Sequence, residues 1–95
     1  MLQAVKDCLK ITWDDEDVNL LNLVDRGKTV LNDLTGTELD FEVESPARAL
    51  LFDYVRYAYN NATEYFEENF GKEILRLQLK AGISLLKGVD VFAEN

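Results

Sequence analysis

The residues of this chain with the clearest capacity for chemistry are four consecutive carboxylates, Asp14, Asp15, Glu16 and Asp17. Such a run can bind a cation, and a pair such as Asp14 and Asp17 can in principle act as general acid and base. The run does not match an EF-hand loop, because it lacks the central glycine and the distal glutamate ligand. Thr12 and Asp15 instead have the spacing of a capping box, and carboxylates stabilise the positive end of a helix. We therefore expect the run to begin a helix and not to hold a metal ion.

Other residue types that support catalysis are scarce in the sequence. The chain contains no histidine, which excludes the commonest metal ligand and every Ser-His or Cys-His nucleophile. Its one cysteine, Cys8, cannot form an internal disulfide bond, so a reducing compartment is expected. Cys8 falls on the apolar face of an amphipathic segment beside Val5 and Leu9, which indicates a small core residue. We expect neither enzymatic activity nor a bound cofactor.

Length, composition and charge indicate a small acidic globular protein. The 95 residues allow one domain, and 47% apolar residues support one modest core. A net charge of −8 argues against binding to duplex DNA, whose phosphates would repel this surface. Most of that charge lies in residues 1–47, which hold 11 acids and 4 bases. No apolar stretch approaches the roughly 18–20 residues of a membrane span, so no membrane contact is expected.

The apolar periodicity predicts an all-α fold, a small bundle of about four helices with residues 1–88 as its helical core. The helices are expected at residues 2–11, 15–34, 46–68 and 72–86. The long third helix should be central, because apolar residues surround most of its circumference. The fourth segment also alternates like a strand, but its composition favours a helix.

Individual residues refine the boundaries and contacts of these helices. Ser45 followed by Pro46 is typical of a helix start, and Gly36 suits a left-handed C-terminal cap. Gly27 lies within the second helix, where a glycine without a Cβ atom permits close approach of another helix. The second helix is expected to bury a stripe that includes Val18 and Leu21.

Tyrosines form an aromatic seam on the third predicted helix, and Tyr57 and Tyr59 are its candidate interface residues. One interpretation is that the rings lie in the core while their hydroxyls reach water. The other is a contact between subunits, where tyrosine is favoured because one end of its ring is dry and the other wet. The sequence supports both interpretations equally.

Two further segments carry apolar side chains that a chain of this length has little core left to bury. The connector at residues 37–44 contributes Leu39, Phe41 and Val43, which alternate with acids. Residues 89–95 are expected to form a flexible tail. Clustered exposed apolar side chains usually mark a contact site, so both segments are candidate protein interfaces, although both could fold back on the chain's own helices. The candidates in the tail are Val89, Val91 and Phe92.

The order of these features resembles a family of phage proteins over about residues 1–70. A short helix carries residues 5–11, an acidic break follows at residues 14–17, and a long helix ends at Leu34-Thr35-Gly36. A loop then leads to Pro46, the run Ala49-Leu50-Leu51 and the aromatic-rich segment at residues 57–61. This pattern resembles the head–tail connector (adaptor, head-completion) proteins of long-tailed bacteriophages and of prophages in Gram-positive bacteria.

The resemblance implies a structural protein without catalytic activity. Members of that family form a ring, typically of twelve subunits, below the portal protein, and they provide the platform for the next head-completion or tail protein. The resemblance therefore implies a location in the virion neck, and in the host cytoplasm during assembly. DNA would pass through the channel without specific binding, and an acidic surface suits that role because it repels the duplex.

A second function remains open, that of a small acidic helical adaptor or DNA-mimic regulatory protein that binds one protein partner. A DNA mimic needs acids spaced along one face like phosphates. In this chain the acids instead gather at a helix start and in residues 38–44, which favours the connector function.

Overall fold

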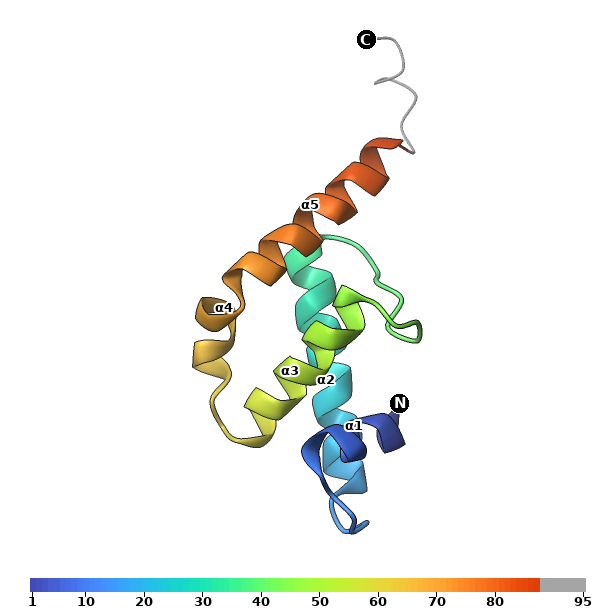
Figure 1. Cartoon of the computed structure of the whole chain (residues 1–95), viewed down its shortest axis with the longest axis vertical. Coiled ribbons are helices and arrows are strands. Elements are labelled where there is room, and N and C mark those ends of the chain that lie inside the picture. The colour runs from blue at the N-terminus through green and yellow to red at the C-terminus, as the bar shows by residue number, and fades with distance from the viewer. Residues whose placement is uncertain (88–95) are drawn as a thin grey trace.

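Residues 1–87 are described by the structure, a computed structural model, and they confirm the all-α fold (Figure 1). Within them, α3 contacts every other helix and is the central element, as the sequence predicts. The helices are α1 (Leu2–Leu9), α2 (Asp17–Thr35), α3 (Pro46–Tyr59), the 3₁₀ turn η1 (Thr63–Tyr65), α4 (Phe66–Asn69) and α5 (Gly71–Lys87).

Helix α1 is shorter than predicted because Lys10 adopts a left-handed conformation, with φ 61°. This turn allows the backbone N–H of Ile11 to donate to the carbonyl of Lys6 over 2.8 Å and places Ile11 in the core. The prediction that Cys8 is a core residue is wrong, because its side chain is exposed. The buried face of α1 is narrow and is centred on Val5.

Helix α2 begins at Asp17, and the predicted capping box of Thr12 and Asp15 does not form. Its N-cap residue is Glu16, whose side chain makes no capping hydrogen bond. The predicted buried stripe is also partly wrong, since Val18 is 74% and Leu21 43% exposed. The core face of α2 instead consists of Leu20, Leu23, Val24, Gly27 and Leu31. As predicted, Gly36 ends the helix with φ 72°.

The close approach predicted at Gly27 is present where α2 packs against α3. A Cβ atom at this position would lie 2.7 Å from Leu51 Cδ1 and 2.9 Å from Tyr54 Cδ1. The start of α3 is also as predicted, with Pro46 in the first turn and the Ser45 hydroxyl accepting a hydrogen bond from the Arg48 amide. These local signals set the position of α3 against α2.

The predicted long helix over residues 46–68 is wrong, because α3 ends at Tyr59. Asn61 has a positive φ of 56°, and the Ala62 amide donates to the carbonyl of Tyr57 over 2.9 Å. The chain then reverses through η1 and α4 (Figure 1). The reversal places Phe66, 1% exposed, edge-on against Tyr54 at a centroid distance of 5.2 Å. A continuous helix would carry Phe66 away from that ring.

Helix α5 confirms the helical interpretation of residues 72–86. Its buried positions Ile74, Leu77 and Ala81 are spaced by three and four residues and face the core. The side chain of Gln78 donates to the carbonyl of Leu34 at the end of α2 over 2.9 Å. Among residues 1–87, no helix is both long and apolar enough to cross a membrane.

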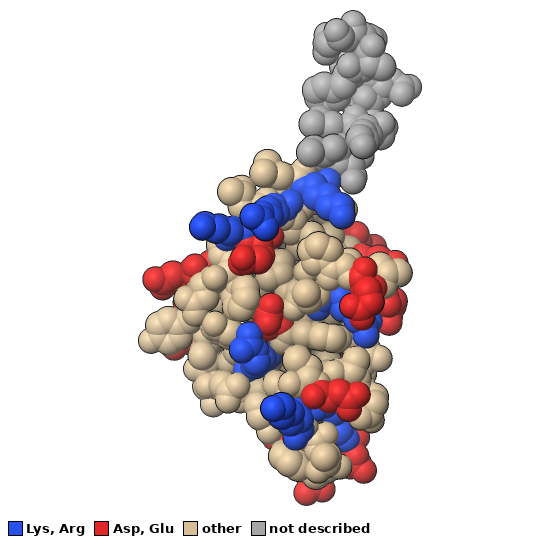
Figure 2. Space-filling view, in the orientation of Figure 1, with Lys and Arg blue, Asp and Glu red and all other residues tan. Residues whose placement is uncertain are grey.

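Charge is unevenly distributed over the face shown in Figure 2. Lysine and arginine side chains gather over α5 at one end of the molecule. At the opposite end, near the turn that joins α1 to α2, acidic and basic side chains lie side by side, with acidic ones at the very tip. Acidic and basic side chains are mixed over the rest of this face, so the basic group over α5 is its clearest charged feature.

Candidate interaction surfaces

The predicted interface residues of the connector differ in their burial. Phe41 is 4% exposed and belongs to the core, which corrects the expectation that the chain has little core left to bury it. Arg48 stabilises this course of the backbone, since its Nη1 donates to the carbonyl of Phe41 over 3.0 Å. Leu39 packs against the core and is half-buried, whereas Val43 is 54% exposed. Of the three, Val43 is therefore the most accessible to a partner.

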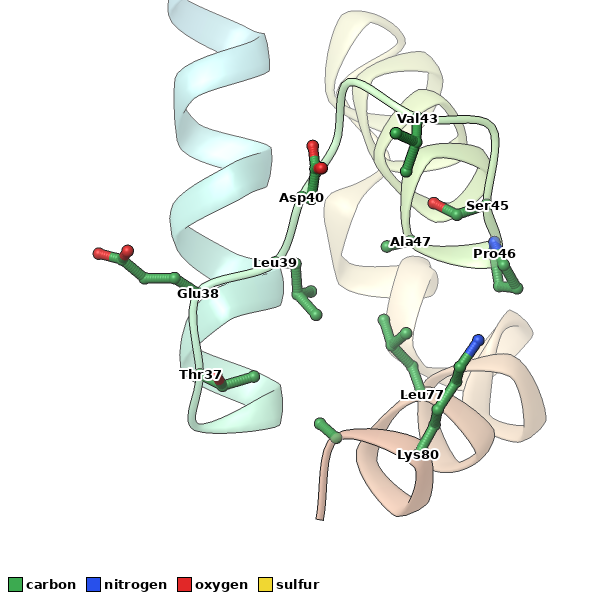
Figure 3. Close-up of a pocket in the computed structure, with 11 residues that line it drawn as sticks. Thr37, Glu38, Leu39, Asp40, Val43, Ser45, Pro46, Ala47, Leu77 and Lys80 are labelled. Atoms are coloured by element: carbon green, nitrogen blue, oxygen red, sulfur yellow. The ribbon is translucent and has the colours of Figure 1, made fainter. Parts of the chain in front are cut away.

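Beside the connector lies an open groove, a hollow of about 400 Å³ between the connector, the start of α3 and α5 (Figure 3). Leu39 and Leu77 point toward each other from opposite walls, while Glu38 points away. Lys80 stands at the edge and extends toward Pro46. The remaining lining residues are Thr37, Asp40, Val43, Ser45, Ala47 and Ala81. The groove is thus apolar inside and charged at its rim.

A second hollow of about 200 Å³ continues the groove between α3 and α5. It shares Pro46, Leu77 and Lys80 with the first hollow. Its rim carries both signs of charge, since Asp53 and Glu73 line it together with Arg76 and Lys80. Both hollows open to the surface, so together they offer an apolar surface to a partner.

Both tyrosines predicted to lie at an interface are half-buried and bonded within the chain. Tyr57 makes edge-on contacts with Phe66 and Phe70, at centroid distances of 6.0 and 5.4 Å. Its hydroxyl accepts a hydrogen bond from Asn69 Nδ2 over 2.9 Å. These contacts hold α4 against α3, and they match the core interpretation with a hydroxyl near the surface.

Tyr59 connects the end of α3 to the start of α2. Its hydroxyl donates to Glu16 Oε2 over 2.8 Å, and the indole N–H of Trp13 donates to the same oxygen over 2.7 Å. The hydrogen bond to Glu16, with smaller contributions from burial and charge repulsion, raises the pKa of Tyr59 above its ordinary value. Glu16 is thus an acceptor that joins two elements.

The acidic run neutralises a buried lysine. Lys6 is 5% exposed, and its Nζ lies 2.6 Å from Asp14 Oδ1 and 2.9 Å from Asp17 Oδ1. Its hydrogen bonds to Asp14 and then Asp17 raise the pKa of Lys6, and they outweigh the opposing effect of burial.

Within the described part of the chain, no three histidine, cysteine or acidic side chains are grouped to hold a metal ion.

Sequence reasoning missed an exposed face of α5. Leu75 and Leu79 are 54% and 58% exposed, and the exposed bases Lys72, Arg76 and Lys80 lie on the same side of the helix. We call these five residues the α5 face. The sequence does contain a signal for this face. If residues 72–86 form a helix, Leu75 and Leu79 fall on the side opposite the buried Ile74, Leu77 and Ala81.

A second exposed apolar surface lies at the start of α2. Val18, Leu21 and the exposed Asp25 are spaced at i, i+3 and i+7, on the side of α2 opposite Leu20 and Val24. Together with the exposed Asp15, they form what we call the α2 surface. The predicted interface residues Val89, Val91 and Phe92 lie outside the described residues.

Searches against protein-family models, curated proteins and solved structures find no match to this chain.

Proposed function

We propose that this chain is a structural subunit of a phage or prophage head–tail connector. In this role it forms a ring below the portal protein, extends the DNA channel and links the capsid to the tail. The support comes from the order of sequence features in residues 1–70 and from the distribution of apolar side chains. The protein acts by binding copies of itself and its neighbours in the virion.

The observation that carries the proposal is the amount of apolar surface that the folded chain leaves accessible. Val18, Val43, Leu75 and Leu79 are each more than half exposed, although the chain has a well-filled core around α3. The open groove adds a further apolar surface beside Val43. Such surfaces on a small protein are typical of sites that bind another protein.

Electrostatics favour a channel subunit over a DNA-binding protein. A net charge of −8 on each copy gives a ring a strongly acidic surface, which repels the phosphates of a passing duplex. The exposed acids of the connector, Glu38, Asp40, Glu42 and Glu44, add to this charge. Low affinity for DNA allows the duplex to move along the channel without being held.

Co-expression with the portal protein of the same phage or prophage tests the proposal. We expect the two proteins to co-purify by affinity and size-exclusion chromatography, and electron microscopy of the complex to show a ring beneath the portal. Absence of any complex with portal or tail proteins would contradict the function. A one-to-one complex with an unrelated regulatory protein would support the alternative of an adaptor or DNA mimic.

A matched pair of variants tests whether the groove takes part in that assembly. Val43 at the groove and Tyr65 on η1 are both 54% exposed, so an aspartate at either position is tolerated by the fold. We expect Val43→Asp to reduce portal co-purification or ring formation, while Tyr65→Asp leaves both unchanged. Equal behaviour of the two variants would exclude the groove as a contact surface.

A further inference from the structure

The α5 face combines positive charge with apolar side chains on a protein that is otherwise acidic. Residues 72–80 hold three bases and one acid, Glu73. Among the side chains that the structure describes, Lys72, Arg76 and Lys80 form no ion pair within 4 Å. Leu75 and Leu79 lie beside these bases on the same side of the helix. This face therefore suits an acidic partner with exposed apolar side chains.

The α2 surface has the complementary character and belongs to the same chain. Of the four acids in residues 15–25, Asp17 is paired with Lys6, whereas Asp15 and Asp25 are exposed. Asp15 and Asp25 form no ion pair with the described side chains, while Val18 and Leu21 lie exposed between them in the sequence. The start of α2 lies at one end of the molecule and α5 at the other (Figure 1). One copy therefore cannot bring its own two surfaces together.

We propose that the α5 face of one copy binds the α2 surface of the next copy. The proposal rests on the proposed function for the identity of the partner, a second copy of the chain, and adds which surfaces meet. Leu75 and Leu79 would lose exposure against Val18 and Leu21, while Arg76 and Lys80 approach Asp15 and Asp25. The apolar residues supply most of the affinity, and the charges set the orientation and exclude wrong pairings.

The net charge of −8 does not prevent this contact. At physiological ionic strength the Debye length is about 8 Å, so exposed charges farther apart than this are largely screened. The acids and bases at the contact act over a shorter distance and are attractive. A contact between two different surfaces is heterologous, and repeated copies then form a closed ring or an open filament.

Two charge-reversed variants and their mixture test the pairing. In Arg76→Glu/Lys80→Glu both surfaces are acidic, and in Asp15→Lys/Asp25→Lys both are basic. Each variant alone should self-associate at least tenfold more weakly than the wild-type chain in sedimentation velocity. Their equimolar mixture should regain association, because every contact in an alternating assembly again joins an acidic surface to a basic one. Both variants keep a negative net charge, so attraction between oppositely charged whole molecules cannot explain the recovered association.

A control with the same charge change at another site makes the test specific. Glu64 and Glu67 are exposed on η1 and α4 and belong to neither surface. Glu64→Lys/Glu67→Lys should not restore association when it is mixed with Arg76→Glu/Lys80→Glu. Restoration by this control, unchanged association of the single variants, or a wild-type chain that stays monomeric at its solubility limit would each overturn the pairing. Circular dichroism establishes that every variant is folded.

The outcome is separable from the proposed function. Association through these two surfaces without any complex with portal or tail proteins would uphold the pairing and contradict the connector function. Rings beneath the portal that are insensitive to both charge reversals would uphold the function and overturn the pairing.

Discussion

Replacing Gly27 with alanine tests how closely α2 and α3 approach each other. In an exposed helix this change stabilises the protein, because alanine is favoured over glycine by about 1 kcal/mol in a helix interior. At Gly27, however, the added Cβ atom would lie 2.7 Å from Leu51 Cδ1 and 2.9 Å from Tyr54 Cδ1. Favourable carbon–carbon contacts lie at about 3.5–4.0 Å, so both side chains must move.

The cost of that movement exceeds the gain in helix propensity. Leu51 is completely buried and Tyr54 is 6% exposed, so neither has open space to enter. Overpacking of a core typically costs about 1–3 kcal/mol. After subtraction of the propensity gain, we expect Gly27→Ala to lower the free energy of unfolding by about 1 kcal/mol. For a domain of this size, that corresponds to a loss of about 4–8 °C in the midpoint of thermal unfolding.

Gly82 provides a matched control on another helix. It lies within α5, and a Cβ atom there would have no neighbour within 4 Å among the side chains that the structure describes. Gly82→Ala should therefore raise the free energy of unfolding by up to about 1 kcal/mol. The two alanine variants should differ by about 2 kcal/mol in urea unfolding, which is well above the error of a direct comparison of midpoints.

A double-mutant cycle with Leu51→Ala assigns the cost to the proposed contact. Leu51→Ala alone should cost about 2–5 kcal/mol, because it leaves a cavity in the core. In that background Gly27→Ala has room for its methyl group and should become neutral or stabilising, a coupling of at least about 1 kcal/mol. If Gly27→Ala stabilised the wild-type chain as much as Gly82→Ala does, the reasoning about the α2–α3 approach would be wrong.

Three further predictions follow from the described contacts. Because the pKa of Lys6 is raised above 10.5, its charged form stabilises the fold below that pH, and this contribution is lost as the pH rises through the raised value. Lys6→Met should therefore unfold at a lower temperature than wild type near neutral pH. The difference between the two unfolding temperatures should disappear at strongly alkaline pH in thermal melts followed by circular dichroism. Asn61 has a positive φ, so Asn61→Ala should lower the free energy of unfolding in urea by about 1–2 kcal/mol, while Asn61→Gly should change it little. Equal effects of the two substitutions would show that a side chain does not strain this turn. Phe66→Ala should lower the free energy of unfolding by about 3–5 kcal/mol, because it removes a ring that is 1% exposed. Phe66→Leu should recover most of that loss. A loss below about 1 kcal/mol for the alanine variant would contradict the role of this ring in stabilising the reversal after α3.

The sequence alone determined the helical class and several local boundaries. Ser45 and Pro46 predict the start of α3, Gly36 predicts the end of α2, and Gly27 predicts a close helix contact. These predictions succeed because each depends on the backbone or packing preference of one residue type at one position. The groove and the α5 face were not found, since both depend on which side of each helix meets a neighbour.

The tertiary structure decided where the chain departs from its local periodicity. The sequence predicts a helix that continues through Asn60 and Asn61, yet the chain turns there because the reversal buries Phe66 against Tyr54. Lys6 is buried and Cys8 exposed, the reverse of their usual preference, because Asp14 and Asp17 can reach the ammonium group of Lys6. Local patterns record the preference of each residue along one helix, whereas burial of a ring or an ion pair depends on partners that only the folded chain brings together.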